Sequence, residues 1–487
     1  MAGIGFELKK LFQHTGVFAS LRAFGYATVI TTGPMLLGVV LLLGLMGICN
    51  FAGISKFNRE LLVCMITYVL LASVTVTSFL SMVVTRFTAD MLFEERNEEV
   101  LPSFWGSALL MMVVGGILWL IFLVFSGATF VQGVLLYILF QELILVWHAM
   151  SYLTAIKDYR NMFRSFFVAI GLSLVLGLVL VVLFHCPAIE SLLLSVSVGY
   201  GVKAVWDIVL LYRHFPRSDA SAFSFMEWID KFPELPWIGF FTNIGLFSHL
   251  VIMWFSTVGV QVKGLFFGAP YHDISALVAF LTILITTVNF VVSVEVNFYP
   301  KYRDYNSLYS DKGTGQDIIQ AEKEMLAVLK NEIFYTALKQ LLFSSLAIAV
   351  GGYLLDLVPL GFNETMKGYF RTLCVAYGLY AIGNMLMLIL LYFIDYSGAF
   401  WGTAVFAAGT VVFSIVSLFF PSLYYGFGFL LASMLFVVVV LARLNYYIKR
   451  LPYYILCVQP LVDEDVRGPY CKTGDWLEKH LGEERKE

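Results

Sequence analysis

The chain has 487 residues, of which 60% are hydrophobic and 13% charged, and its formal net charge is −3. A soluble domain averages about 45–50% apolar and about 25% charged residues, so this composition indicates an integral membrane protein and excludes a soluble fold. The small net charge gives no reason to expect a nucleic acid as a partner. The six cysteines have no metal-site spacing, and no nucleotide-binding or nucleophile motif stands in the required context. We therefore expect no metal, no cofactor and no catalytic residues.

The first segment, residues 1–22, precedes the first long apolar run. Its apolar residues Ile4, Leu8, Leu11 and Phe12 fall on one helical face, with charged residues elsewhere. This pattern predicts an amphipathic helix that lies in the membrane interface.

Twelve apolar runs follow, and each is about long enough to cross a hydrocarbon core of ~30 Å. They cover residues 24–49, 61–85, 105–126, 129–152, 162–185, 191–212, 237–257, 274–298, 334–356, 369–394, 399–420 and 422–443. We predict an all-α fold with an N-terminal six-helix lobe, 23–212, and a C-terminal lobe, 237–443. The polar segment 213–236 is the predicted linker, and the polar tail 444–487 is expected outside the bundle.

The orientation follows from the loops between the runs. If the N-terminus is cytoplasmic, the cytoplasmic segments hold most of the 31 Lys and Arg residues. The opposite side holds Lys56, Arg59, Lys263, Lys367 and Arg371. Because positive residues favour the cytoplasmic side, both termini are predicted to be cytoplasmic.

Two features suggest gating positions. Gly33 and Pro34 interrupt the first run, and a proline removes a backbone hydrogen bond and kinks a helix. Kinked helices beside a lumen are common in transporters, although a static kink explains the same residues. Glu295, near the end of the eighth run, is placed in the same group; the alternative is a local ion pair with Lys301 or Arg303.

The sixth run contains Lys203 at its midpoint and Asp207 one turn later. A charge at that depth costs at least ~2.5–3.5 kcal/mol on insertion scales, so it normally faces other helices or a wet cavity. Glu142, in the fourth run, lies at a similar depth, because both residues are about 20 Å along their helices. We predict a Glu142–Lys203 ion pair, with Asp207 as the competing partner at i+4. These residues and Tyr200 are assigned to the substrate path.

The eighth run carries a polar stripe, since Thr282, Thr286, Asn289, Ser293 and Asn297 share one helical face. Small polar residues in membrane helices often bond neighbouring helices. Five of them in line favour a hydrated lumen, and we predict that they line the substrate path.

Further substrate-path candidates lie in the seventh and tenth runs: His249, Tyr377, Tyr380 and Asn384. Flat aromatic rings stack well on sugar rings, and they also simply fill space. A lone buried histidine is more often a packed polar residue than a proton relay.

Residues 317–333 form a predicted helix between the eighth and ninth runs. Asp317 and Gln320 resemble a capping box at its start. One apolar stripe follows, made of Ile319, Leu326, Leu329 and Ile333. The stripe either packs on the membrane face of the protein or docks a cytoplasmic partner, and we assign it to docking.

The opening GIGFELKKL, the run LRAFGYATVITTGPMLL and the later stretch VEVNFYPKYRDYN resemble the Pel exopolysaccharide exporter (PelG) family. The resemblance covers most of the chain, although the tail beyond about residue 450 is longer than the family leads us to expect. It implies a member of the multidrug/oligosaccharidyl-lipid/polysaccharide (MOP) superfamily, with two lobes around a central cavity and alternating access. It also implies a bacterial inner-membrane location and an N-acetylgalactosamine-rich polymer as cargo, exported for the biofilm matrix. The implied partners are a cytosolic glycosyltransferase, which would dock on 317–333, and other Pel inner-membrane proteins.

Three rival functions stay open. The first is a flippase for lipid-linked oligosaccharides with the same fold, and the second is a scaffold that holds the polymer synthase without transport. The third is a small-molecule antiporter.

Overall fold

The computed structural model describes residues 36–156, 158–310, 313–357, 363–458 and 467–482. Within them, eleven helices are long and apolar enough to cross a membrane, and a shorter apolar helix covers Leu36–Phe51. This shorter helix is the described part of the first predicted run. The segment 1–22 and the kink residues Gly33 and Pro34 lie outside the described residues.

The N-terminal lobe contains the helix Leu36–Phe51 and five longer helices. They are α3 (Lys56–Phe93), α4 (Val100–Phe125, after the short η1, Asn97–Glu99), α5 (Phe130–Ile156), α6 (Tyr159–Leu178, continued by the π-helical turn η2, Val179–Leu183) and α7 (Ala188–His214). Polar side chains cap the N-termini of several helices. The Ser55 side chain accepts a hydrogen bond from the Asn58 amide at the start of α3, and the Asp158 side chain accepts one from the Asn161 amide at the start of α6. Helix α7 packs against both α5 and α6 and is the centre of this lobe.

The C-terminal lobe begins with α9 and a two-stranded antiparallel hairpin. Its elements are α9 (Glu234–Trp254), β1 (Val260–Lys263), β2 (Phe266–Gly268), α10 (Pro270–Phe280), η3 (Leu281–Ile283), α11 (Leu284–Val292), η4 (Ser293–Phe298), α12 (Tyr299–Ser310), α13 (Gly315–Leu357), α14 (Glu364–Tyr392), α15 (Tyr396–Ser417), η5 (Ser422–Tyr424), α16 (Phe427–Ile448), α17 (Leu451–Tyr453) and η6 (Tyr454–Val458). Helix α14 is the most enclosed span of this lobe and contacts α10, α13 and α16.

The eighth predicted run, 274–298, is not one regular helix. It contains most of α10, the 3-10 turn η3, α11 and the π-helical η4, and α12 continues beyond it. The hydroxyl of Thr282 donates to the carbonyl of Ala279 at 2.7 Å inside the break. Such side-chain bonds compete with the regular helix pattern, and short 3-10 and π segments absorb the irregularity.

The predicted helix 317–333 is not a separate element, because it is the first part of the 43-residue α13, which also contains the ninth run. No proline or glycine separates the polar and apolar parts before Gly351, so nothing ends the helix between them. The predicted capping box is shifted by one turn. The Thr314 hydroxyl accepts the Asp317 amide at 3.3 Å, and the Asp317 carboxylate accepts the Thr314 amide at 3.0 Å.

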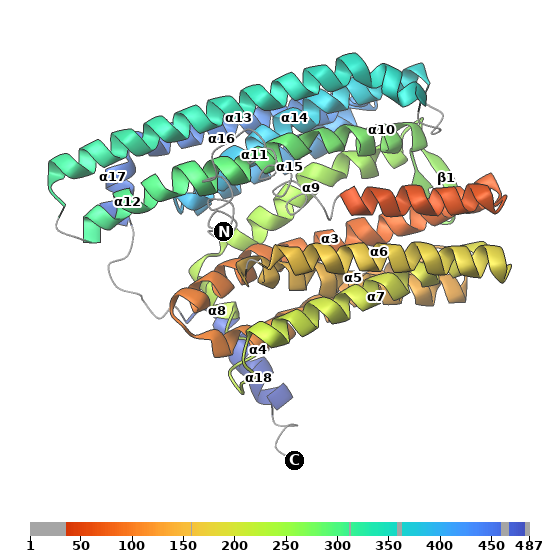
Figure 1. The fold of residues 1–487 in the computed structure, drawn as a ribbon, viewed down its shortest axis with the longest axis horizontal. Coiled ribbons are helices and arrows are strands. Elements are labelled where there is room, and N and C mark those ends of the chain that lie inside the picture. The colour runs from red at the N-terminus through yellow and green to blue at the C-terminus, as the bar shows by residue number, and fades with distance from the viewer. Residues whose placement is uncertain (1–35, 157, 311–312, 358–362, 459–466, 483–487) are drawn as a thin grey trace.

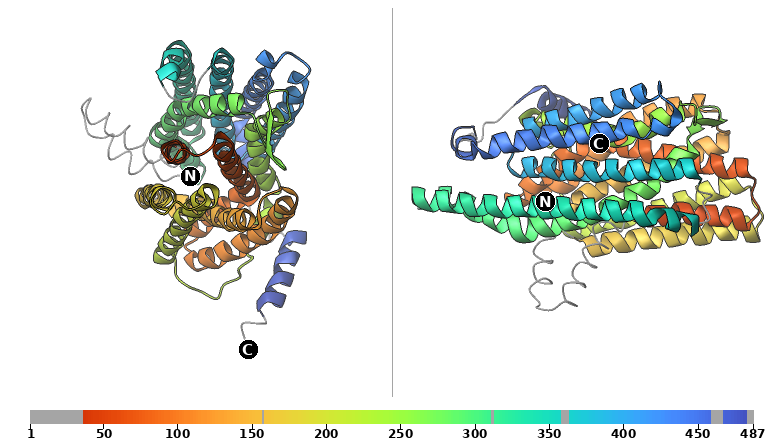
Figure 2. Two further views of the ribbon diagram at one scale, coloured as in Figure 1. Left: turned by 90° about the vertical axis from the view of Figure 1, so that its right-hand side faces the viewer. Right: turned by 90° about the horizontal axis from the view of Figure 1, so that it is seen from above.

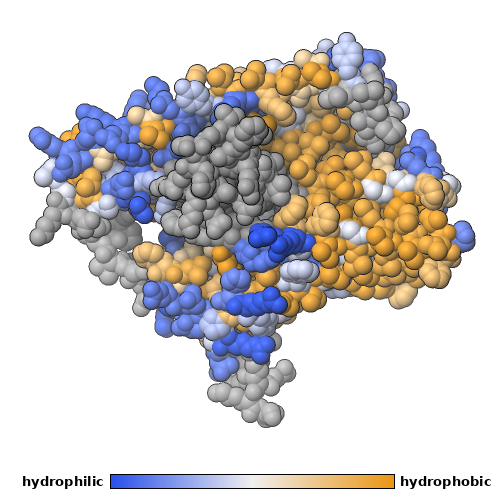
Figure 3. Space-filling view, viewed as in Figure 1, coloured by the Kyte–Doolittle hydropathy of each residue, from blue (hydrophilic) through white to orange (hydrophobic). Residues whose placement is uncertain are grey.

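The two lobes lie one above the other in Figure 1, and their helices run roughly along the same direction (Figure 2). We call the end that carries β1 and β2 the hairpin end. The other end carries α8 (Met226–Lys231) in the segment between the lobes, and we call it the linker end. In the view of Figure 3, hydrophobic residues cover the flank towards the hairpin end, and hydrophilic residues gather towards the linker end. This protein is therefore a multi-pass membrane protein with a broad apolar flank.

Candidate functional site at the lobe interface

The lobes meet where α3 of the N-terminal lobe packs along α9 of the C-terminal lobe. A Cβ atom added to Gly239 would lie 2.2 Å from the carbonyl oxygen of Ser78, so only glycine permits this approach. The ring of Phe79 contacts Trp237 and Phe240 edge to face nearby, at centroid distances of 5.4 and 6.4 Å. Small residues that allow backbones to approach are typical of helix contacts in membranes.

At the hairpin end, the β1–β2 hairpin of the C-terminal lobe lies on the N-terminal lobe. The ring of Tyr68 on α3 stacks on Trp254 at 4.5 Å, and its hydroxyl accepts the Phe267 amide at 3.1 Å. The Leu265 amide donates to the Ser126 carbonyl at the end of α4, at 3.0 Å. We call this set of contacts, completed by Cys64 and Gly264, the hairpin clasp.

The clasp depends on close backbone contact. Gly264 at the hairpin turn has a φ of +55°, and a Cβ there would lie 2.1 Å from the Ser126 carbonyl oxygen. Gly127 opposite has a φ of +77° and would place a Cβ 3.2 Å from the Cα of Gly264. Both positions therefore need glycine, which adopts positive φ without steric cost. Beside them, a Cβ on Gly268 would lie 3.1 Å from the sulfur of Cys64.

At the linker end, α3 contacts the segment between the lobes. The indole of Trp228 on α8 donates to Asp90 at 2.8 Å, and Asp90 also accepts from Arg86 at 2.9 Å. The Arg86 guanidinium lies over the ring of Phe232, and that ring contacts Tyr396 of α15 at 5.3 Å. The two lobes are thus joined at both ends of the α3–α9 contact.

The predicted Glu142–Lys203 ion pair is wrong, and the competing partner Asp207 takes its place. Lys203 and Asp207 form an ion pair with both side chains 0% exposed. The Ser165 hydroxyl accepts from Lys203 at 3.2 Å and donates to Asp207 at 2.9 Å, and the Lys203 ammonium lies over the ring of Phe166 at 3.8 Å. The pair is sealed between α6 and α7.

Glu142, on α5, lies at the expected depth but contacts a different face of α7 from the one that carries Lys203. It accepts from the Ser197 hydroxyl at 2.8 Å, and its other oxygen would be 2.8 Å from a Cβ on Gly201. Because each residue turns a helix by about 100°, Lys203 points away from the side that carries Ser197 and Gly201. Tyr200, on the same helix, is 4% exposed and belongs to the lobe core.

The polar residues of the eighth run do share one face, but this face contacts α13 and not the predicted hydrated lumen. Thr286 donates to Gln340 of α13 at 2.5 Å, Lys339 donates to Asn289 at 2.6 Å, and Asn297 donates to Glu332 at 2.8 Å. Thr282, Thr286, Asn289 and Ser293 are all at most 5% exposed. The stripe therefore bonds α11 and its flanking turns to α13.

Three other predicted substrate-path residues lie in the interior of the C-terminal lobe. His249 is 1% exposed and within 3.2 Å of the Tyr377 hydroxyl. Tyr380 stacks on Phe406 at 5.5 Å and is 7% exposed. Asn384, one turn further along α14, is half-buried. His249, Tyr377 and Tyr380 are therefore core side chains here.

The apolar stripe assigned to docking mostly faces inward. Leu329 is 2% exposed, and Leu326 and Ile333 pack partly buried against the core, whereas Ile319 is 54% exposed. Packing thus accounts for three of the four residues. The side chain of Glu295 lies outside the described parts of the chain; its two expected partners pair elsewhere, Lys301 with Glu324 at 2.8 Å and Arg303 with Asp304 at 3.9 Å.

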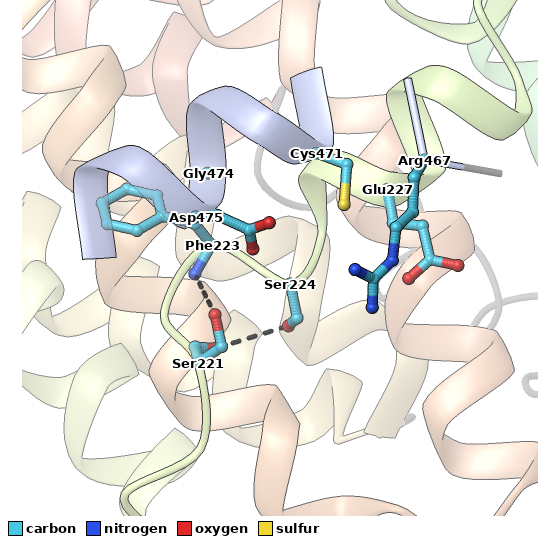
Figure 4. A pocket seen from close by; sticks show the side chains of 8 residues that line it. All are labelled: Ser221, Phe223, Ser224, Glu227, Arg467, Cys471, Gly474 and Asp475. Atoms are coloured by element: carbon cyan, nitrogen blue, oxygen red, sulfur yellow. Dashed lines mark hydrogen bonds between the residues drawn. The ribbon is translucent and has the colours of Figure 1, made fainter. Parts of the chain in front are cut away.

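The tail contributes one more element, α18 (Pro469–Gly482), which packs on α8. The Asp230 carboxylate accepts the backbone amides of Tyr470 and Cys471 at the start of α18, at 3.3 and 2.7 Å. A pocket of about 260 Å³ lies between the two helices, lined by Ser221, Phe223, Ser224, Glu227, Arg467, Cys471, Gly474 and Asp475 (Figure 4). Burial raises the pKa of the Cys471 thiol and Asp475 raises it further, so this thiol is not activated.

Reasoning from the sequence missed the lobe interface. Tyr68, Phe79, Gly239 and Gly264 carry its contacts, and nothing in their spacing distinguishes them from ordinary span or loop residues. Trp254 lies inside the seventh predicted run, but nothing in the sequence indicates its partner across the lobes.

The fold of this chain is similar to the folds of solved transporters. A MOP-superfamily transporter from Pyrococcus furiosus is 13% identical, with 88% of this chain and 96% of that chain covered and a TM-score of 0.59. An outward-facing multidrug resistance MATE transporter is 12% identical over 88% and 96% of the chains, with a TM-score of 0.58. An inward-facing MATE structure is 14% identical over 88% and 99%, with a TM-score of 0.55. The fold is that of a MOP-superfamily transporter.

The chain belongs to the PelG family of exopolysaccharide exporters (EPS-E), whose family model matches residues 1–456. The sequence resemblance is thereby confirmed. The tail helix α18 lies beyond the matched residues. Among proteins with curated functions, none matches this chain.

Proposed function

We propose that this chain exports a Pel-like, N-acetylgalactosamine-rich polysaccharide across a bacterial inner membrane, and that the two lobes open alternately at the hairpin end and the linker end. The family match over residues 1–456 is the observation that carries the proposal. The geometry is consistent with it, because beyond the packing of α3 along α9 the two ends of this contact carry separate sets of hydrogen bonds. The family and fold are those of transporters, and the proposal includes no catalytic step.

The clasp offers a direct test of the lobe movement. In the variant Gly268→Cys, the new sulfur stands beside the natural Cys64, close enough for a disulfide between the lobes. Oxidation should lock the hairpin end and abolish polymer export, measured with an N-acetylgalactosamine-specific lectin outside the cells. Reduction should restore export.

Two controls sharpen this experiment. Gly268→Cys with Cys64→Ser cannot form the bond, so oxidation should leave export unchanged. Continued export by fully cross-linked protein would overturn the alternating movement. It would also favour the rival function of a scaffold, which needs no movement of this chain.

A lipid-linked oligosaccharide flippase is another rival, since it shares the fold. A flippase requires a lipid carrier, whereas the proposed exporter passes a free polymer. Depletion of the carrier lipid should leave export intact if the proposal is right and stop it if the chain is a flippase.

We also propose that the linker end is cytoplasmic and that a glycosyltransferase docks near the projecting start of α13, where Ile319 is exposed. Reporter fusions after residues 225 and 263 should then report opposite sides of the membrane. Ile319→Asp should weaken co-purification with the enzyme, and the neighbouring exposed change Gln320→Asp serves as the control. Unchanged co-purification with Ile319→Asp would contradict docking at this site.

A further inference from the structure

Two histidines lie side by side in the C-terminal lobe near the hairpin end. His249 of α9 is 1% exposed and His272 of α10 is 0% exposed, and their ring centroids are 5.4 Å apart. The ring of His249 also stacks on Phe429 of α16 at 4.2 Å. Both imidazoles are therefore held rigidly inside the lobe.

Most of the nitrogens of these rings have no hydrogen-bond partner among the described residues. His249 Nε2 meets the Tyr377 hydroxyl, but its Nδ1 and both nitrogens of His272 are unpaired. One oxygen of Asp273 is also unpaired and lies 3.7 Å from His272 Nδ1. Leaving a buried polar group unsatisfied is costly, so such a cluster persists only if something else compensates for it.

Asp273 connects this cluster to the hairpin clasp. Its second oxygen accepts from the Trp254 indole at 2.9 Å and from the Ala269 amide at 3.0 Å. Trp254 in turn stacks on Tyr68 across the lobe boundary. The Asp273 side chain is 30% exposed, so protons can reach the cluster from the surface.

The other ionisable side chains next to the two rings or to Asp273 are hydroxyls and a thiol. They are Tyr369 and Tyr377 on α14, and Cys64 with Tyr68 on α3. Asp273 is thus the group that could compensate for a positive charge on the imidazoles.

We propose that His249 and His272 together bind one proton, with Asp273 as its counter-ion, and that binding loosens the hairpin clasp. A proton on His272 adds a donor that faces the unpaired Asp273 oxygen, and the resulting attraction draws the carboxylate away from Trp254 and Ala269. A proton fits this site better than sodium, because imidazole nitrogens bind protons directly and sodium needs several oxygen ligands. The loosening of the clasp rests on the proposed lobe movement, whereas the binding of the proton does not.

Proton counting tests the site itself. Purified protein should bind about one proton more between pH 5 and 8 than the double variant His249→Phe/His272→Phe. The change His148→Phe is the matched control. That buried imidazole bonds to Ser107 and should stay neutral, so its removal should not alter the count. If the Phe variant does not give a single folded species, His249→Gln/His272→Gln replaces it. Equal proton counts for wild type and the double variant would overturn the proposal.

A second measurement tests the link to the clasp. Disulfide formation between Cys64 and Gly268→Cys is followed at pH 5.5 and pH 8, with and without His272→Phe. At pH 8 the rates should agree, and at pH 5.5 the protein that keeps His272 should react several-fold more slowly. Because the comparison is made at one pH, the ionisation of the thiols cancels. If the two proteins react at equal rates at pH 5.5 as well as at pH 8, although the extra proton is bound, proton binding does not loosen the clasp. Lobe movement itself is then still tested by the export experiment.

Discussion

The two lobes treat their buried polar groups differently. In the N-terminal lobe, Lys203, Asp207 and Ser165 satisfy one another, and His148 Nε2 bonds to the Ser107 hydroxyl at 2.7 Å. In the C-terminal lobe, the face of α11 is bonded to α13, but His249 and His272 keep unpaired nitrogens. Satisfied polar groups fix a packing arrangement, whereas unsatisfied ones mark a place where another state or a bound species is favourable. The unpaired imidazole nitrogens place the candidate switch in the C-terminal lobe.

The largest effect is expected from the buried ion pair. Lys203→Met should leave Asp207 buried and unpaired, which costs about 3–5 kcal/mol. The amount of folded protein in the membrane and its melting temperature in detergent should fall sharply. The double change Lys203→Met/Asp207→Leu should recover most of the loss, because no charge is left unpaired. If the double variant is as unstable as the single one, the pair is not a closed unit.

The satisfied part of the C-terminal lobe should give the next largest effect. Gln340 bonds to Thr286, to Ser344 and to the Thr282 carbonyl. Gln340→Leu should cost about 1–3 kcal/mol through the groups left unsatisfied, seen as a lower melting temperature. The exposed change Asn297→Ala, at the end of the same stripe, is expected to stay within about 0.5 kcal/mol. An equal effect of the two would mean that the stripe contacts water.

One histidine variant from each lobe allows a direct comparison of the two lobes. His148→Phe removes a partner of the Ser107 hydroxyl and should cost about 1 kcal/mol. His272→Phe removes no hydrogen bond seen among the described residues, so its melting temperature at pH 8 should stay close to that of wild type. The reverse order of stability would contradict the contrast between the lobes.

The smallest effect is expected at Glu142. Glu142→Gln can still accept from the Ser197 hydroxyl, so its effect on stability should stay within about 0.5 kcal/mol. A loss as large as that of Lys203→Met would revive the Glu142–Lys203 pair. The melting temperatures of the two variants, measured side by side, decide this.

The sequence determined the class of protein and much of the local structure. Apolar runs of span length required helices, because a bilayer offers no partner for free backbone groups. The polar stripe from Thr282 to Asn297 and the Lys203–Asp207 spacing could be predicted as well, because both follow from the helical repeat alone. The continuity of α13 could also have been recognised from the absence of a helix breaker after Asp317.

Only the tertiary structure decided what each face contacts. The rise per residue gave Glu142 and Lys203 the same depth, but the rotation of α7 turned Lys203 towards α6 and Ser197 towards Glu142 of α5. In the same way, the sequence could not show which neighbours three other features have. The polar stripe bonds to α13, the hairpin lies on Tyr68, and the two histidines come together from different helices. Depth and periodicity are properties of one helix, whereas a neighbour depends on how all the helices pack, and packing in a membrane is set by many small contacts between them.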